Sequence, residues 1–265
     1  MPIVFSAIVP HPPVLIPAIG KEHLKKIKKT EGAMKALEQE LYAAKPETLL
    51  IISPHGQILK ESFCINLSPD FDGDLKEFGD FSTNLKFKCD YMSIQYIRAA
   101  DETQSKNPLV LISEPKIDHG SLIPLFYLTQ HLKTLPIIPL YYSGLDLNAH
   151  YEFGKFIYRQ LSRLNKRVAI VASGDLSHRL TKDAPAGFSK RGKEFDEKLI
   201  KLISDKKVKE ILNLDKKLIK DAAECGLRSI AILLGILAEA DYQPEVLSYE
   251  GPFGVGYLVA NMKFA

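Results

Sequence analysis

The sequence has few cysteines and almost no excess of charge. Its 265 residues contain three cysteines, Cys64, Cys89 and Cys225, so any disulfide scheme leaves one unpaired and a disulfide framework is excluded. A chain of this kind suits a reducing cytosol, and we expect the protein to be cytoplasmic. The formal net charge of +3 is too small to indicate binding to nucleic acid or to an acidic membrane surface.

Long apolar runs are also missing. No run approaches the roughly 20 residues of a membrane-spanning helix. The chain opens with the strand-like run Ile3–Val9, without a basic segment or a small-residue cleavage site, so we expect no signal peptide. Because we find no repeat, low-complexity tract or linker, we expect a single domain over residues 1–265.

The apolar runs that are present alternate with amphipathic segments. Runs that are apolar on both faces predict buried strands, and segments with apolar residues every three or four positions predict helices. The expected strands are 3–9, 48–52, 109–112, 137–142, 168–172, 245–249 and 255–262, and the expected helices are 21–44, 91–101, 121–133, 150–164, 192–204, 208–214 and 230–238. This order predicts an α/β domain with a mostly parallel or mixed central sheet and helices on both faces.

Residues 59–91 differ from this pattern. A strand is expected at 63–67, followed by an acidic, aromatic and glycine-containing segment over residues 69–81 that fits either a lid or a hairpin excursion. Asp70, Asp72 and Asp74 alternate as in a calcium-binding loop. Because Phe81 stands where such a loop needs its glutamate, calcium binding is not expected.

Histidines follow the apolar strands. His11 and His55 lie in proline-containing loops after the strands at 3–9 and 48–52, and His178 ends the motif Ser-Gly-Asp-Leu-Ser-His after 168–172. His119 lies at an expected helix start, where Ser121 is the expected cap. Because strand ends of a parallel sheet form sites at one edge, we expect these four rings to converge. His23, His131 and His150 have the context of surface residues.

Converging imidazoles predict a metal site. Two neutral imidazoles and an anionic ligand leave open positions on a divalent metal, and further histidines can move protons near neutral pH. Cys225 precedes a helix start, a position that favours a thiolate, although a buried inert thiol is a common alternative. Glu224 is alternatively a helix cap, and Glu250 a brace for a turn. The candidate anionic ligands are Glu224, Cys225, Glu250 and Asp175.

The ordered motifs resemble a known family over essentially the whole chain. The family is the catalytic-subunit (B) superfamily of class III extradiol ring-cleaving dioxygenases. The Glu-Cys-Gly element further resembles the Memo-like branch, which includes the B protein of the AmmeMemoRadiSam system. The motifs are Val-Pro-His-Pro-Pro, Ser-Pro-His-Gly, Asp-His-Gly-Ser-Leu-Ile-Pro-Leu, Ser-Gly-Asp-Leu-Ser-His, Glu-Cys-Gly and Tyr-Glu-Gly-Pro-Phe-Gly-Val-Gly-Tyr.

The resemblance implies a role for each motif residue. His11 and His55 correspond to metal ligands, His178 to an acid/base catalyst, and His119 to a second catalytic-site histidine that contacts substrate or oxygen. Cys225 aligns with the third ligand, which is a glutamate in the dioxygenases. Glu224, one residue earlier, is the alternative third ligand.

Two functions therefore remain open. The first is a non-haem Fe(II) extradiol dioxygenase that cleaves a catechol-type aromatic ring with O2. The alternative is a Memo-like metal-binding protein without ring cleavage, acting with AMMECR1-like and radical-SAM proteins. A zinc hydrolase is a third, less favoured reading. The resemblance implies Fe(II), with Zn(II) as an alternative occupant of the purified protein, and we expect a homo-oligomer that binds neither nucleic acid nor membrane.

Overall fold

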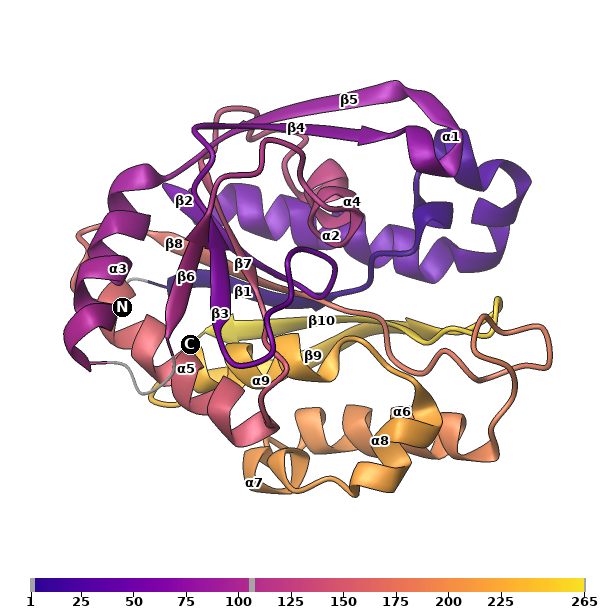
Figure 1. Cartoon of the computed structure of the whole chain (residues 1–265). Helices are drawn as coiled ribbons and strands as arrows, with labels where there is room; N and C mark the ends of the chain where they lie inside the picture. The colour runs from indigo at the N-terminus through magenta and orange to yellow at the C-terminus, as the bar shows by residue number, and fades with distance from the viewer. Residues whose placement is uncertain (1–2, 105–107, 265) are drawn as a thin grey trace.

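The structure is a computed structural model that describes residues 3–104 and 108–264. In that part of the chain, eight strands form one mixed sheet in the order β6-β3-β7-β2-β8-β1-β10-β9 (Figure 1). The expected α/β fold is confirmed. The strands of this sheet are β1 (Ile3–Val9), β2 (Thr48–Ser53), β3 (Phe63–Asn66), β6 (Leu109–Ile112), β7 (Ile137–Tyr141), β8 (Val168–Ser173), β9 (Tyr242–Glu250) and β10 (Tyr257–Phe264).

The central strands β7, β2, β8 and β1 run parallel to one another. β2 and β8 are buried along their whole length, which explains why both read as continuous apolar runs. β3 pairs antiparallel with β7, and β10 pairs antiparallel with β1, so the outer parts make the sheet mixed. The carboxyl ends of the four central strands consequently lie at one edge of the sheet.

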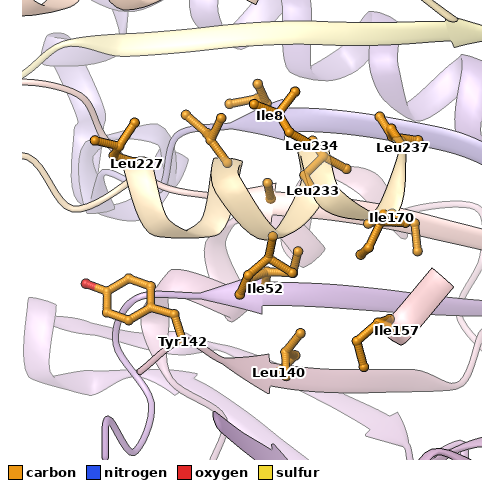
Figure 2. Close-up of a cluster of buried hydrophobic side chains, with 14 of the residues drawn as sticks. Ile8, Ile52, Leu140, Tyr142, Ile157, Ile170, Leu227, Leu233, Leu234 and Leu237 are labelled. Atoms are coloured by element: carbon orange, nitrogen blue, oxygen red, sulfur yellow. The ribbon is translucent and has the colours of Figure 1, made fainter. Parts of the chain in front are cut away.

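Helices cover both faces, as expected (Figure 1). On one face, α2 and α4 pack Met34, Leu37 and Leu122 against the sheet. On the other face, α5 and α9 pack against each other and share one buried cluster with the sheet. Figure 2 shows Leu233 and Leu234 of α9 beside Ile8, Ile52 and Ile170 of the sheet. The helices are α1 (Pro17–Gly20), α2 (Lys28–Ala44), α3 (Tyr91–Gln104), α4 (His119–Leu128), α5 (Leu147–Leu161), α6 (Lys190–Ser204), α7 (Val208–Leu212), α8 (Lys216–Ala222) and α9 (Leu227–Ile236).

Residues 69–81, for which the sequence allowed either a lid or a hairpin, belong to a hairpin. β4 (Asp70–Leu75) and β5 (Asp80–Lys88) pair antiparallel as a separate two-stranded sheet. Phe71 and Phe87 of this hairpin are buried in the same cluster as α2 and α4. The hairpin is therefore packed against the body of the domain by its apolar side chains.

Several helix boundaries differ from the sequence-based expectations. The expected helix 21–44 begins as a 3-10 helix over Lys21–Ile27, and α2 continues from Lys28 through Gly32, which has open space around it. α4 starts at His119 and is capped by Asp118, whose carboxylate accepts from the Ser121 amide, so Ser121 is not the cap. α8 was not expected from the sequence, because its polar residues give little periodicity.

His150 was wrongly expected at the surface. It is fully buried, its Nε2 atom accepts from the Ser143 amide at 3.2 Å, and its Nδ1 atom lies 2.7 Å from the Asp146 carbonyl oxygen. Burial lowers its pKa to about 4, so the ring stays neutral. The exposure expected for His23 and His131 is confirmed.

None of the helices in the described residues combines the length and apolar character that a membrane-spanning segment requires.

Candidate metal centre

His11 follows β1 in a loop stiffened by prolines on both sides, and its ring is held from behind. Its backbone amide donates to Asp175 Oδ1 at 3.0 Å, and its Nδ1 atom lies 2.9 Å from Ser173 Oγ. The Ser173 hydroxyl donates to the Gly120 carbonyl oxygen at 2.5 Å, so its oxygen is left to accept from the His11 Nδ1–H. This arrangement leaves the lone pair of His11 on Nε2, which faces the other rings.

His55 brings a second nitrogen to the same point. Its Nε2 atom lies 2.9 Å from His11 Nε2, and the two rings are perpendicular with centroids 4.7 Å apart. Burial, with a further contribution from the neighbouring histidines, lowers the pKa of His11 well below its usual range and the pKa of His55 to about 4. Both rings are therefore neutral at neutral pH, and the two nitrogens can coordinate one cation together when His55, like His11, carries its proton on Nδ1.

Cys225 is the third donor. Its Sγ atom lies 3.7 Å from His11 Nε2, and the donor atoms of His11, His55 and Cys225 all lie within 4.8 Å of one another. Burial raises the pKa of the thiol well above its usual range, and the carboxyls of Asp175 and Glu224 add to this. The sequence argument that a helix start favours the thiolate is thus outweighed by burial. A metal ion has to supply the positive charge that deprotonates this thiol.

The turn that carries Cys225 approaches the end of β8 very closely. A side chain at Gly174 would place its Cβ 2.1 Å from the Cα of Gly226, so Gly174 requires glycine, and a Cβ at Gly226 would lie 3.0 Å from the Gly174 carbonyl carbon. The Cys225 and Gly226 amides donate to the Asp175 carbonyl oxygen at 3.3 and 3.0 Å. These contacts fix the sulfur beside the histidine rings.

The other candidate anionic ligands have different partners. Glu224 Oε2 accepts from the Leu227 amide at 2.6 Å, so Glu224 caps the start of α9 and does not join the cluster. Glu250 Oε1 accepts from the Thr30 amide at 2.6 Å and from the Thr30 hydroxyl at 2.9 Å, which braces the start of α2. Asp175 accepts from the His11 amide, and its burial raises its pKa to about 7.

His119 and His178 complete the ring of imidazoles. The His119 ring stacks on His55 with centroids 4.2 Å apart, and Phe78 from the hairpin contacts its other side at 5.2 Å. His178 is close enough to lower the pKa of both His11 and His55. Its Nδ1 atom is buried and has no hydrogen-bond partner among the described residues. The four histidines singled out in the sequence are therefore brought together.

A cavity of about 550 Å³ opens beside these rings. His55, His119 and Tyr141 line it from the sheet edge, and Glu77 lines it from the hairpin. The volume lies within the range of small-molecule sites in proteins, about 300–1,000 Å³. The cavity therefore has room for an aromatic molecule beside His55, the one residue of the three donors that lines it.

Two positions that support the site were missed in the sequence. Asp196 is fully buried and accepts from the Ser177 amide at 2.8 Å and from the Tyr249 hydroxyl at 2.6 Å, directly behind His178. Ser173 was noted only as the first residue of its motif, yet it orients His11. No local pattern marks Asp196, whereas Ser173 could have been inferred from its place at the end of a strand beside that of His11.

The donor set suits a divalent transition metal. Two nitrogens bound to one metal at about 2.1 Å and at a right angle lie about 3.0 Å apart, close to the 2.9 Å found between His11 and His55. Imidazole nitrogen and thiolate sulfur bind Zn, Fe and Cu in preference to Mg or Ca. Non-haem Fe(II) oxygenases usually have two histidines and a carboxylate, and the sulfur is the departure from that set.

The fold and the site define an α/β protein with a histidine- and cysteine-lined centre at the carboxyl edge of its sheet. The chain belongs to the LigB family, because the family described as "Catalytic LigB subunit of aromatic ring-opening dioxygenase" matches residues 6–260.

The chain is also similar to individual curated proteins. Protein CA_C1420 of Clostridium acetobutylicum is 32% identical over 97% of this chain and 56% of its own length. The 3,4-dihydroxyphenylacetate 2,3-dioxygenase of Escherichia coli is 27% identical over 50% of this chain and 51% of its own length. The chain thus spans about half the length of the curated relatives that it matches.

A solved structure shares the fold. The uncharacterized protein JW3007 from Escherichia coli K12 superposes with a TM-score of 0.65 at 13% identity and covers 98% of this chain and 99% of that one.

Proposed function

We propose that the protein is a non-haem Fe(II)-dependent dioxygenase that opens the ring of a catechol-type aromatic with O2. The observation that carries this proposal is the convergence of His11, His55 and Cys225 on one point beside a cavity. Membership of the LigB family supports it, because enzymes of this family generally use non-haem iron. When bound, the metal supplies a Lewis acid and a common site for the two hydroxyl groups and O2.

The protein side chains have distinct roles in this proposal. His11, His55 and Cys225 hold the metal, and Ser173 keeps the His11 lone pair on Nε2. His178 is the acid/base group, since its ring is neutral and its buried Nδ1 lacks a partner. His119 and Tyr141 line the cavity, so an aromatic ring can lie against them, and Phe78 contacts the His119 ring.

Turnover of catechols tests this function. Protein reconstituted anaerobically with Fe(II) is mixed with O2 and a panel of substituted catechols, and O2 uptake and the coloured ring-opened product are recorded. His178→Gln should lower kcat by about 10²-fold or more while metal content stays unchanged, as expected for loss of an acid/base group. Full metal loading without O2 uptake across the panel would contradict the dioxygenase assignment.

The second candidate is a Memo-like metal-binding protein without ring cleavage. It is favoured by one feature, the sulfur of Cys225 in place of a carboxylate, with Glu224 occupied as a helix cap. In this case the protein acts with AMMECR1-like and radical-SAM partners. Co-purification of these partners with the metal-loaded protein, together with absent catechol turnover, would separate the second candidate from the first.

A further inference from the structure

A second and larger cavity lies away from the four histidines. It has a volume of about 700 Å³ and opens between the start of α5, α8 and the start of α9. None of the histidines of the candidate metal centre lines it. Figure 2 shows Leu227, at the start of α9, and Tyr142 at the same end of the sheet face that α9 covers.

Three cations line this cavity. Lys216 and Lys220 come from α8 and are exposed, and Arg228 comes from α9. None of the three forms an ion pair or a side-chain hydrogen bond with a residue that the structure describes. The Arg228 guanidinium lies instead over the Tyr142 ring, 5.7 Å from its centroid. The two lysines consequently have no acidic partner among the described residues, whereas Arg228 is close enough to Glu224 to oppose the burial that raises the pKa of that carboxyl.

The two acidic residues of the lining are already engaged. Asp146 Oδ1 accepts from the Ala149 amide at 2.8 Å and caps α5, and Glu224 Oε2 accepts from the Leu227 amide at 2.6 Å. Both carboxylates therefore satisfy backbone donors at helix starts. The lysines and the arginine remain as the groups that can bind a ligand.

The remaining wall is largely apolar. Leu145, Leu214 and Ile219 are among the side chains that line it. We propose that this cavity binds an anionic molecule with an apolar body, of the class of carboxylates or phosphate esters. The cations bind the anionic group, and the leucine and isoleucine side chains cover the apolar part.

The cavity is coupled to the metal centre through the chain itself. Ala223 and Glu224 line the cavity, and the next residue, Cys225, is in the donor cluster. An occupant of the cavity thus contacts the turn that holds the sulfur, although it does not reach the metal. Binding here needs neither metal nor turnover, so its test is independent of the proposed dioxygenase activity.

Displacement of a fluorescent anion tests the proposal. The probe is 1-anilinonaphthalene-8-sulfonate, which has an aromatic body and a single negative charge, and the competitors are octanoate, octyl phosphate and 1-octanol. We expect saturable binding that octanoate or octyl phosphate displaces and that 1-octanol, equal in chain length but neutral, displaces at least tenfold less well. The stronger of the two anions identifies the ligand as a carboxylate or a phosphate ester.

Charge variants locate the site. The double variant Lys216→Glu/Lys220→Glu should weaken binding about tenfold, whereas Lys217→Glu, an exposed lysine of the same helix that does not line the cavity, should not. Arg228→Met gives a second reading if the double variant fails to fold by circular dichroism. Equal displacement by 1-octanol, unchanged binding by the double or the Arg228 variant, or equal weakening by Lys217→Glu would overturn the proposal.

Discussion

His11 Nε2 and His55 Nε2 lie 2.9 Å apart although the two residues are 44 positions apart in the sequence. Both rings are neutral, His11 buried and His55 exposed, so the contact is made either by an N–H···N hydrogen bond or by a cation bound to both nitrogens, and the Cys225 sulfur beside them favours the cation. From this contact we expect the protein to bind one divalent metal ion.

Replacing either ring by alanine tests the contact. His11→Ala or His55→Ala removes one of three donors, and we expect the metal content of anaerobically prepared protein to fall from one ion per chain to near zero. Elemental analysis after gel filtration measures it. The matched control is His131→Ala, an exposed histidine that pairs with Glu38 far from the cluster. Retention of metal by both site variants would contradict the centre.

The identity of the third ligand is tested separately at two neighbouring positions. Because Cys225 points into the cluster and Glu224 caps α9, the Co(II)-loaded protein should show a sulfur-to-cobalt charge-transfer band. Cys225→Ser should abolish this band and Glu224→Gln should keep it. The opposite outcome would make Glu224 the ligand and restore a carboxylate set. Absorption spectra in the near ultraviolet distinguish the two.

Ser173 should control metal affinity without touching the metal. Ser173→Ala removes the acceptor of the His11 Nδ1–H, so the ring loses its fixed orientation and tautomer. We expect metal affinity to fall about 10- to 100-fold, as found for groups that orient ligating histidines. A competition titration with a chromophoric chelator measures the affinity. Ser6→Ala, a buried serine of β1 with only a 3.5 Å contact to Met262, is the control and should have little effect.

Asp196 should make stability depend on pH. Burial raises its pKa from 3.8 to about 6, so between about pH 4 and about pH 6 the unfolded chain releases a proton that the folded protein keeps. Unfolding is therefore favoured increasingly as the pH rises through this window. Asp196→Asn removes this effect, and its free energy of unfolding relative to the parent should rise by up to about 3 kcal/mol from acidic to neutral pH.

Urea titrations at several pH values measure this difference. Tyr249→Phe supplies a second check, because the Tyr249 hydroxyl donates to Asp196 and holds its pKa down. Loss of this hydroxyl should raise the pKa of Asp196 in the folded protein, so the upper end of the pH window should move to higher pH. A difference between Asp196→Asn and the parent that is the same at acidic and neutral pH would show that folding does not raise the pKa of Asp196.

The fold could be predicted largely because its strands are buried on both faces. The runs over residues 49–52 and 168–172 are apolar throughout, and they are too short for a buried helix. Helix ends were less predictable, because caps depend on which side chain reaches the amides: Asp118 does so in place of Ser121. His150 was misjudged because it stands at an expected helix start, whereas its neighbours in space are Phe63 and Tyr142.

The candidate site could be predicted as a set of strand-end histidines, but not as a geometry. The prolines beside His11 and His55 mark stiff loops, and parallel strands bring such loops to one edge. Whether Cys225 or Glu224 faces the cluster depends on the path of the turn before α9, which is held by contacts with residues distant in sequence, such as Gly226 with Gly174. Asp196 is distant in sequence from every motif, and its role follows from packing alone.

The three donors come from positions 11, 55 and 225, and so from both halves of the chain. A bound ion is therefore a reversible cross-link between segments that no disulfide joins. Because the ion binds the folded protein, it stabilises the entire domain by an amount that grows with the logarithm of the free metal concentration. Scarcity of the ion would make the protein easier to unfold and degrade, so its cellular abundance would follow the availability of the metal.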